Sequence, residues 1–478
     1  MKRCLLVFAV CVGALAGFSG DSGRTAGTPL EKSMFDMPEL SPEDRVLVLA
    51  PHPDDEVLAT AGIIQKAVER GTQLRVVFLT YGDSNEWSFV VYRKRPVVLP
   101  RAVQSMGQVR RGEALAAART LGLPVERLIF LGYPDFRTLD IWCSHWGSAR
   151  PAENMLTRVT AVPYSNAFRP GAQYKGEEVL RDLEDILREF RPTKVFVSHP
   201  SDHNSDHQSL YLFLRVALWD VAGEIGPAVF PYIVHYGHWP APRGYHPEAR
   251  MAPPPLFDQV SQWESQDLTP AEVERKEAAL REHKSQYEAA PRYLQSFVRV
   301  NEIFGDTPDV YLSSGGPSVS LSAGHGASYG ELPEQLLDEE RRAFIGIRER
   351  HARLEDGRLV LSVKLSRPLR KEVSASLYVF GYRRDVAFSR MPKLHVKLGQ
   401  SDYRVYDQDS ELAADVVSVE RGSEEVTVRI PLELLGNPDR ILTGAHTRLL
   451  GVIPLDWVSW RVLRGDSLMI AREPEAGG

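Results

Sequence analysis

The chain has 478 residues, of which 43% are hydrophobic and 25% are charged, and its formal net charge at pH 7 is -6. A chain of this length is expected to form two or three domains, and its composition is that of an ordinary globular protein. The acidic balance argues against a general nucleic-acid-binding protein, which would usually be basic.

The segment 1–20 has the pattern of a secretory signal peptide. Lys2 and Arg3 supply its positive charge, an apolar run follows at 4–16, and small residues at 14–16 form a cleavage pattern. The apolar run is shorter than the roughly 20 residues that span a bilayer, so no stable membrane span is expected, with an N-terminal anchor as the alternative. This pattern predicts an exported protein, periplasmic or extracellular.

Between 41 and 312, continuous apolar runs alternate with amphipathic ones. Strands are expected at 45–50, 74–80, 126–135, 194–200 and 229–236. Helices are expected at 62–71, 108–122, 177–190, 208–222 and about 271–287. Continuous apolar strands that alternate with helices predict a parallel sheet covered on both faces, as in a doubly wound, Rossmann-like α/β domain. In such folds ligands bind beyond the carboxyl ends of the strands.

Three further segments differ in character from this pattern. The loop at 84–107 is rich in Trp, Tyr, Arg and Pro, and a loop of this length favours a lid or a binding element. The segment at 313–338 has the composition of a linker. Beyond it, residues 339–478 alternate in hydrophobicity at strand lengths, which predicts a C-terminal all-β, sandwich-like domain.

The candidate chemistry begins where the first strand ends, in the sequence APHPDDE at 50–56. An imidazole from His52 and a neighbouring carboxylate suit zinc or a similar divalent ion. Because successive side chains point in different directions, Asp54 and Asp55 can divide the work, one binding the metal and the other facing the attacking water. The alternative is a helix with one aspartate as its N-cap, which leaves His52 unexplained.

A second polar cluster follows the fourth expected strand, in the sequence HPSDHNSDHQ at 199–208. It contains three histidines and two aspartates: His199, His203, His207, Asp202 and Asp206. Histidines in a loop are often solvated, so this cluster alone is a moderate signal. Two such clusters at neighbouring strand ends together predict a metal site.

The sequences APHPDDE, RRGEALAAARTLG with FLGYPD, and SDHNSDHQ resemble the PIG-L/LmbE-like family of zinc-dependent N-acetylglucosaminyl deacetylases, over about 45–304. The resemblance implies a hydrolase that uses Zn2+ or another divalent metal to remove an N-acetyl group from an N-acetylglucosamine-type sugar or glycoconjugate. It implies His52, Asp55 and His207 as metal ligands. It also implies that Asp54 activates a zinc-bound water that attacks the amide.

The second cluster departs from the family pattern at one place. Many members have HPDH where this chain has Asn204 in place of the first histidine, with His203 one position earlier. Either residue could assist the oxyanion or the leaving amine, His203 from a shifted position and Asn204 as a hydrogen-bond donor. His235 and His238, which follow the fifth strand, are the alternatives.

Arg110 and Glu113 match an arginine-and-glutamate pair on the family helix, and Asp135 resembles a family position that can bond sugar hydroxyls. Arg110 could bind substrate oxygens or a phosphate, or it could form a helix ion pair with Glu113. Asp135 could bond sugar hydroxyls, or it could be a turn residue after Pro134. Arg110 and Asp135 are both predicted as substrate-binding residues.

The C-terminal domain shows no catalytic cluster. The sequences EVTVRIPLELLG and VIPLDWVSWRVL resemble sugar-binding β-sandwich modules, which implies a carbohydrate-binding role. Trp457 and Trp460 could stack on sugar rings or lie in the core.

The expected partner of the whole chain is an acetylated amino sugar or glycan, and the sequence does not indicate an oligomeric state. Two alternatives stay open. One is a hydrolase of another amide or ester on the same site. The other is a non-catalytic glycan-binding protein on a deacetylase scaffold.

Overall fold

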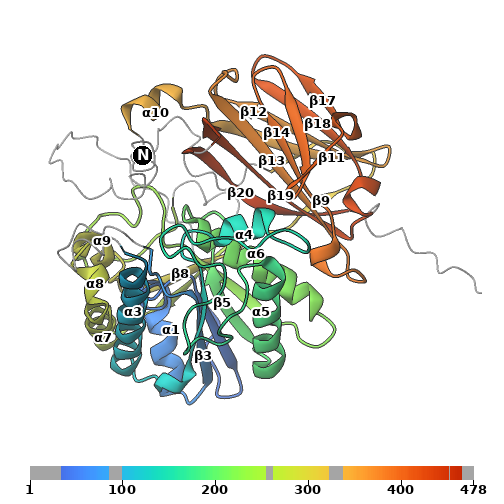
Figure 1. Ribbon diagram of the computed structural model, residues 1–478. Coiled ribbons are helices and arrows are strands. Elements are labelled where there is room, and N and C mark those ends of the chain that lie inside the picture. Colours follow the sequence, from blue (N-terminus) through green and yellow to red (C-terminus); the bar gives the residue numbers. More distant parts are fainter. Residues whose placement is uncertain (1–33, 85–98, 255–261, 322–336, 452, 466–478) are drawn as a thin grey trace, which may run out of the picture.

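The computed structural model describes residues 34–84, 99–254, 262–321, 337–451 and 453–465, which form an α/β domain and a β domain packed against each other (Figure 1). The expected signal peptide at 1–20 and most of the expected loop at 84–107 lie outside these residues. Among the described residues, no helix has the length and apolar character needed to cross a membrane.

The α/β domain is built on a five-stranded sheet in which every pair of neighbours is parallel. Its strands are β2 (Arg45–Ala50), β3 (Gln73–Thr80), β4 (Leu128–Tyr133), β5 (Lys194–Ser198) and β6 (Ala228–Tyr232), in the order β4-β3-β2-β5-β6. This confirms the predicted doubly wound, Rossmann-like sheet. The direction of winding reverses between β2 and β5, and the ends of those two strands form the topological switch point where ligands bind in such folds.

Helices cover both faces of the sheet, and their buried apolar residues form one core with it on each side (Figure 1). One face is covered by α1 (Asp55–Glu69), α3 (Pro100–Thr120) and α7 (Pro270–Glu282). The other is covered by α4 (Thr138–Ser144), α5 (Gly176–Phe190) and α6 (Ser205–Asp220). A three-stranded sheet completes the domain, with β1 (Phe35–Asp36), β7 (Trp263–Asp267) and β8 (Asn301–Gly305), together with α8 (Lys284–Tyr287) and α9 (Pro291–Gln295).

Three of the element starts that differ from the sequence-based expectation have a clear local cause. Helix α1 begins at Asp55 rather than 62, because the polar turn after β2 leads directly into the helix and its acidic first turn suits a helix N-terminus. Helix α3 begins inside the expected loop at 84–107, with Pro100 in the first helical position that favours proline. A 3-10 turn at Val125–Arg127 delays the start of β4.

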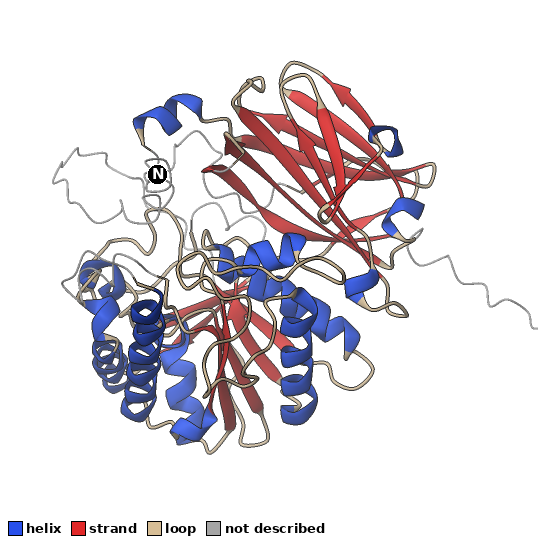
Figure 2. Cartoon of the chain, viewed as in Figure 1, coloured by secondary structure: helices blue, strands red, loops and turns tan. Residues whose placement is uncertain are grey.

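The C-terminal domain is an all-β sandwich of two sheets, as predicted (Figure 2). The first contains β10 (Val319–Ser320), β11 (Ile347–Glu355), β12 (Arg358–Leu365), β18 (Glu425–Pro431) and β17 (Ser418–Arg421). The second contains β16 (Ser410–Leu412), β15 (Tyr403–Asp407), β14 (Lys393–Leu398), β13 (Val373–Tyr382), β19 (Arg440–Leu449), β20 (Ile453–Gly465) and β9 (Val310–Leu312). Helix α10 (Asp338–Ala343) precedes β11.

The boundary between the domains lies earlier than the predicted 312. Strand β9 falls within the range expected for the α/β domain, yet it pairs with β20 at the edge of the second sheet. Strand β10 falls within the expected linker at 313–338, yet it pairs with β11. Short edge strands of this kind have no periodicity of their own to reveal them, because only their partners define them.

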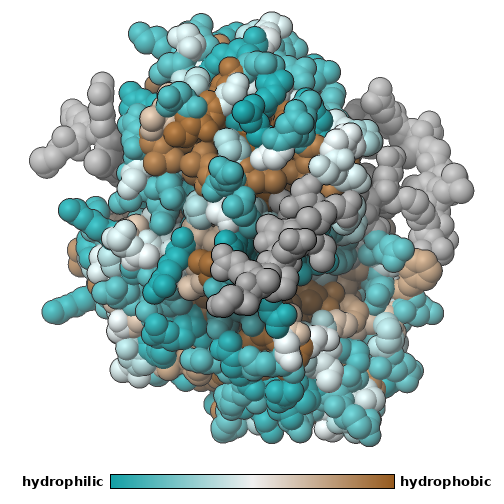
Figure 3. All heavy atoms as spheres, turned by 90° about the vertical axis from the view of Figure 1, so that its right-hand side faces the viewer, coloured by the Kyte–Doolittle hydropathy of each residue, from teal (hydrophilic) through white to brown (hydrophobic). Residues whose placement is uncertain are grey.

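The outer face of the seven-stranded sheet packs against α4, α5 and α6 rather than facing solvent. Trp460 on β20 is 3% exposed and packs edge-on to Trp142 of α4, with ring centroids 5.9 Å apart. Trp460 is therefore a core residue and not a sugar-stacking one, whereas the side chain of Trp457 lies outside the described part of the structure. Figure 3 shows the two domains in contact, with hydrophilic residues over most of the lower one on this face and a hydrophobic patch on the upper one.

Candidate metal centre

The two polar clusters predicted from the sequence meet at the switch point of the sheet. Strand β2 ends at Ala50 and delivers the first cluster, and β5 ends at Ser198 and delivers the second. Because β2 and β5 are hydrogen-bonded neighbours, the residues that follow them are brought side by side.

His52, Asp55 and His207 converge on one point. The Oδ2 atom of Asp55 lies 3.2 Å from Nδ1 of His52 and 3.1 Å from Nε2 of His207, and all three residues are buried. Ligand atoms of these three residues and of His235 lie within 4.8 Å of one another. The structure therefore brings together the three residues predicted as metal ligands, and it adds His235 to the group.

The second nitrogen of each imidazole faces a carboxylate. Nε2 of His52 lies 3.1 Å from Oδ1 of Asp135 and 3.2 Å from Oδ2 of Asp206, and Nδ1 of His207 lies 3.1 Å from Oδ2 of Asp202. A carboxylate in this place holds the ring hydrogen on the outer nitrogen and directs the lone pair of the inner nitrogen toward a cation. The arrangement is that of a preorganised metal site.

These orienting carboxylates are themselves held by backbone N–H groups. Asp206 accepts hydrogen bonds from the backbone nitrogens of Phe136, at 2.6 Å, and Thr138, at 3.1 Å. Asp202 accepts from the backbone nitrogens of Val234 and His235, each at 2.9 Å. Although burial opposes ionisation, the neighbouring His207 lowers the pKa of Asp202 to about 2. Sequence reasoning singled out Asp202 and Asp206 only as parts of a cluster, because their partners come from distant segments.

Asp135 occupies a place different from the one its predicted role would favour. It is buried behind His52, and its Oδ2 accepts a hydrogen bond of 2.8 Å from the backbone nitrogen of Ser84. Its position suits a group that orients His52 better than one that binds sugar hydroxyls. Its role in substrate binding stays a prediction.

Asp54 lies beside the cluster in a conformation that few residues adopt. Its φ of 128° is positive, which is strained for any residue other than glycine and is typical of functional sites. It holds the N-cap position of α1, but its side chain makes no capping hydrogen bond, which excludes the simple cap. Its backbone nitrogen donates to Oε2 of Glu56 at 2.8 Å, and its carboxylate lies 3.3 Å from Nη2 of Arg110.

Arg110 holds the turn that carries Asp54. The guanidinium is buried and donates to the backbone oxygens of Gly82, at 2.8 Å, and Pro53, at 2.6 Å. Its ionic partner is Asp54, not Glu113, whose carboxylate instead accepts from the nitrogen and hydroxyl of Ser285. The alternative of a helix ion pair between Arg110 and Glu113 is therefore excluded, and substrate binding by Arg110 stays a prediction.

Gly82 is required for this contact. Its φ is +61°, and a Cβ added there would lie 2.0 Å from Nη1 of Arg110.

We expect Gly82→Ala to lower the free energy of unfolding by about 2–4 kcal/mol, from backbone strain and displacement of the guanidinium. Urea denaturation measures this, with Gly112→Ala in the exposed part of α3 as control, which should gain about 0.5–1 kcal/mol. Equal effects of the two changes would contradict this account of Gly82.

His283 lies behind Asp54 and was not predicted. Its Nε2 lies 2.9 Å from Oε1 of Glu56, and both residues are buried. Glu56 thus joins the backbone of Asp54 to the end of α7. No local motif marks His283, because its partner is 227 residues away in the sequence.

The residues that the sequence offered for assisting the oxyanion or the leaving amine have different surroundings in the structure. Asn204 is the N-cap of α6, where its Oδ1 accepts from the backbone nitrogen of Asp206 at 2.8 Å. His203 is exposed, with its ring 4.7 Å from that of Tyr236, and it is not among the residues that converge with Asp55. His238 is also exposed and outside that group.

His235 is the histidine that faces the centre from the end of β6. It is partly exposed, whereas the other three converging residues are buried. Its ring packs edge-on to that of His207 at 4.7 Å, and its Nδ1 lies 3.4 Å from the hydroxyl of Tyr293. Burial lowers the pKa of His235 to about 4, so the imidazole is neutral at neutral pH.

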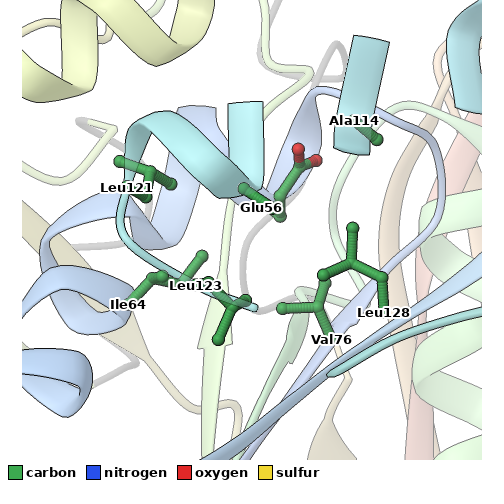
Figure 4. A pocket seen from close by; sticks show the side chains of 8 residues that line it. Glu56, Ile64, Val76, Ala114, Leu121, Leu123 and Leu128 are labelled. Atoms are coloured by element: carbon green, nitrogen blue, oxygen red, sulfur yellow. The ribbon is translucent and has the colours of Figure 1, made fainter. Parts of the chain in front are cut away.

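A small cavity lies next to this region but is not a substrate site. Its walls are aliphatic apart from Glu56, and include Ile64, Val76 and Leu121 (Figure 4). Its volume is about 10 Å³, which is room for one water molecule at most. We interpret it as a packing gap between α1, α3 and the sheet.

Comparisons with known proteins support the resemblance of the α/β domain to the PIG-L/LmbE-like family. Residues 47–218 match the PIG-L family, described as GlcNAc-PI de-N-acetylase. A similar curated protein is 1D-myo-inositol 2-acetamido-2-deoxy-alpha-D-glucopyranoside deacetylase 1 of Saccharopolyspora erythraea, 31% identical over 35% of this chain and 50% of its own. The deacetylase of the same name from Tsukamurella paurometabola is 28% identical over 52% of this chain and 84% of its own.

Among solved structures, the N,N'-diacetylchitobiose deacetylase from Pyrococcus horikoshii is 22% identical, with a TM-score of 0.33, over 55% of this chain and 82% of that one. The chain spans half the length of the first curated relative. The matches to both curated relatives cover about half of this chain or less.

Proposed function

We propose that this chain, whose residues 47–218 match the PIG-L family, is a metal-dependent N-deacetylase that removes an acetyl group from an N-acetylglucosamine-type sugar or glycoconjugate. The convergence of His52, Asp55 and His207 at the switch point, with Asp54 beside them, carries this proposal. The names of the curated relatives, which specify deacetylases of an acetylated glucosamine derivative, support the substrate class.

The residues present fit a divalent cation. Two imidazoles and one carboxylate are a set that suits zinc and leaves a coordination position open for catalysis. Both imidazoles have their outer nitrogens held by carboxylates, which is the usual support of such ligands. A cation held by His52, Asp55 and His207 would polarise the amide carbonyl and make a bound water more acidic.

Asp54 is placed to move the proton. Burial raises the pKa of Asp54 to about 7, and the Arg110 guanidinium opposes that rise. A positioned carboxylate can take a proton from water and return it to the leaving amine. Arg110 and Glu56 hold the strained turn, so the carboxylate keeps one orientation through the reaction.

We propose that His235, rather than His203 or Asn204, stabilises the negative charge that develops on the carbonyl oxygen of the substrate. Asn204 uses its side-chain oxygen as a helix cap, and His203 lies on Tyr236 outside the converging group. His235 alone combines a place in that group with partial exposure. From there it can hydrogen-bond the carbonyl oxygen as negative charge develops on it, an effect that accounts for large rate factors in acyl transfer.

His235→Gln is therefore expected to lower kcat about 100-fold, within the range found for such groups. The matched control is His203→Gln, which should keep kcat within about two-fold because an exposed histidine outside the site contributes little. Metal content of both variants is measured in parallel. A large loss of kcat in His203→Gln with none in His235→Gln would instead support His203, the residue predicted from the sequence, in this role. Loss of metal in His235→Gln would make His235 a fourth ligand.

The function itself is tested with a panel of substrates. The zinc-loaded full chain is incubated with N-acetylglucosamine, N,N'-diacetylchitobiose and N-acetylglucosaminyl-inositol, and released acetate is measured. Acetate from at least one of them is the expected result. Release only from simple amides or esters would favour another hydrolase on the same site. Glycan binding without any turnover would favour a binding protein on a deacetylase scaffold.

A further inference from the structure

We propose that the β domain is a structural part of the metal centre, in which Ser459 of β20 positions the loop that carries Asp202 and His207. This inference rests on the proposed metal centre. It assigns the β domain a role other than that of an independent glycan-binding module.

The interface between the domains has the character of a protein core. The indole of Trp142 on α4 lies 5.4 Å from the ring of Phe388 and 5.8 Å from that of Phe380, measured between centroids. Interfaces between mobile domains are usually more polar than this. Helices α4 and α6 lie directly against β19 and β20 (Figure 1), and the two domains therefore form one packed unit.

The first connection to the metal centre runs through the second polar cluster. The hydroxyls of Ser459 and Ser201 are hydrogen-bonded at 2.8 Å, and both residues are buried. On the β side, the backbone oxygen of Ser459 accepts from the buried guanidinium of Arg350 at 2.6 Å. Ser459 is thus held firmly in the sandwich, and it holds Ser201 in turn.

Ser201 is joined to the ligand-orienting residues by short steps. Its backbone nitrogen donates to Nδ1 of His199 at 3.0 Å, so the ring hydrogen of His199 is on Nε2, which donates to the hydroxyl of Thr307 at 2.9 Å. Asp202, which orients His207 at 3.1 Å, is the next residue in the chain. A shift of Ser201 is therefore passed through one peptide unit to the carboxylate that orients a metal ligand.

A second connection reaches the other ligand histidine. Thr138, the first residue of α4, donates its backbone N–H to Asp206, and Asp206 faces Nε2 of His52 at 3.2 Å. The same helix carries Trp142 into the domain interface. Both imidazole ligands are thus oriented by carboxylates that depend on segments packed against the β domain.

The outer face of the seven-stranded sheet is not available to a glycan. Its aromatic residues Tyr378, Phe380, Tyr382 and Trp460 are all buried, in one core with α4 and α6. An appended sugar-binding module would instead present such aromatic rings to solvent. Burial of this face favours a supporting role for the domain.

The test compares two serine variants of the full chain. Ser459→Ala removes the hydrogen bond to Ser201, and Ser362→Ala removes a bond of 2.9 Å to Thr427 in the other sheet of the sandwich. The dissociation constant for Co²⁺, the visible spectrum of the Co²⁺-loaded protein and the thermal midpoint are measured for each. We expect Ser459→Ala to weaken Co²⁺ binding about three- to ten-fold and to alter the spectrum, less than the 10–100-fold loss found when a directly orienting partner is removed.

Ser201→Ala removes the same hydrogen bond but leaves the β sandwich unaltered. A shared effect of the two variants can therefore not come from misfolding of the sandwich. The double variant should bind Co²⁺ no more weakly than either single variant, because residues in one hydrogen bond do not act additively. Co²⁺ binding by Ser459→Ala equal to that of Ser362→Ala, with an unchanged spectrum, would overturn this inference alone. Absence of Co²⁺ binding in the unmodified chain would overturn the proposed metal centre and this inference together.

Discussion

Replacing Asp54 with asparagine is expected to lower kcat by about 10³-fold while the metal stays bound. The amide has the shape of the carboxylate and can still accept from Arg110, but it cannot take a proton, and a positioned base contributes about 10²–10⁴-fold to such reactions. Because Asp54 lies beside the converging ligands rather than among them, its change should leave metal affinity nearly intact. Acetate release at saturating substrate, together with metal content, measures both quantities.

The control for this change is Asp36→Asn, which alters an exposed aspartate on β1 and should leave both quantities as they are. Retention of more than a tenth of kcat in Asp54→Asn would mean that another group is the base. Loss of metal from that variant would instead place Asp54 among the ligands.

His207→Ala is expected to remove the metal and, with it, the activity. His207 is fully buried, its Nε2 faces Asp55 at 3.1 Å, and its Nδ1 faces Asp202. Since removal of a mere orienting partner already costs about 10–100-fold in metal affinity, loss of a ligand should cost at least about 100-fold. Metal content after dialysis, measured by elemental analysis, provides the readout.

His203→Ala is the matched control, since it removes a histidine from the same loop whose ring is exposed. It should retain one equivalent of metal. If His207→Ala keeps its metal and His235→Ala loses it, the ligand set is His52, Asp55 and His235 instead.

Much of the fold is readable from residue patterns. The continuous apolar runs that form β2, β3 and β5 have no polar face, which only a sheet covered on both sides can accommodate. Polar residues directly after two such strands must then lie at one edge of the sheet. For this reason the residue pattern alone predicts one metal site from the cluster that contains His52 and Asp55 and the cluster that contains His207.

Other residues of the centre could not be found in this way. His283 pairs with Glu56 across 227 positions, and Asp135 lies behind His52 rather than on an open surface. His235 and His203 are both loop histidines in the sequence, and nothing in their neighbours tells them apart. Their difference depends on how the end of β6 packs against α6, which is a property of the whole domain.

The sequence by itself determined the parallel sheet, the sandwich that follows it and the position of both polar clusters at one edge of that sheet, because periodicity and strand ends are local properties of the chain. Only the tertiary structure decided that Arg110 pairs with Asp54, that Trp460 is buried and that Ser459 reaches Ser201. Each of these depends on which side chains from distant segments share a buried space. A buried polar group is stable there only if it forms a hydrogen bond, and its partner can come from any segment that the fold places next to it.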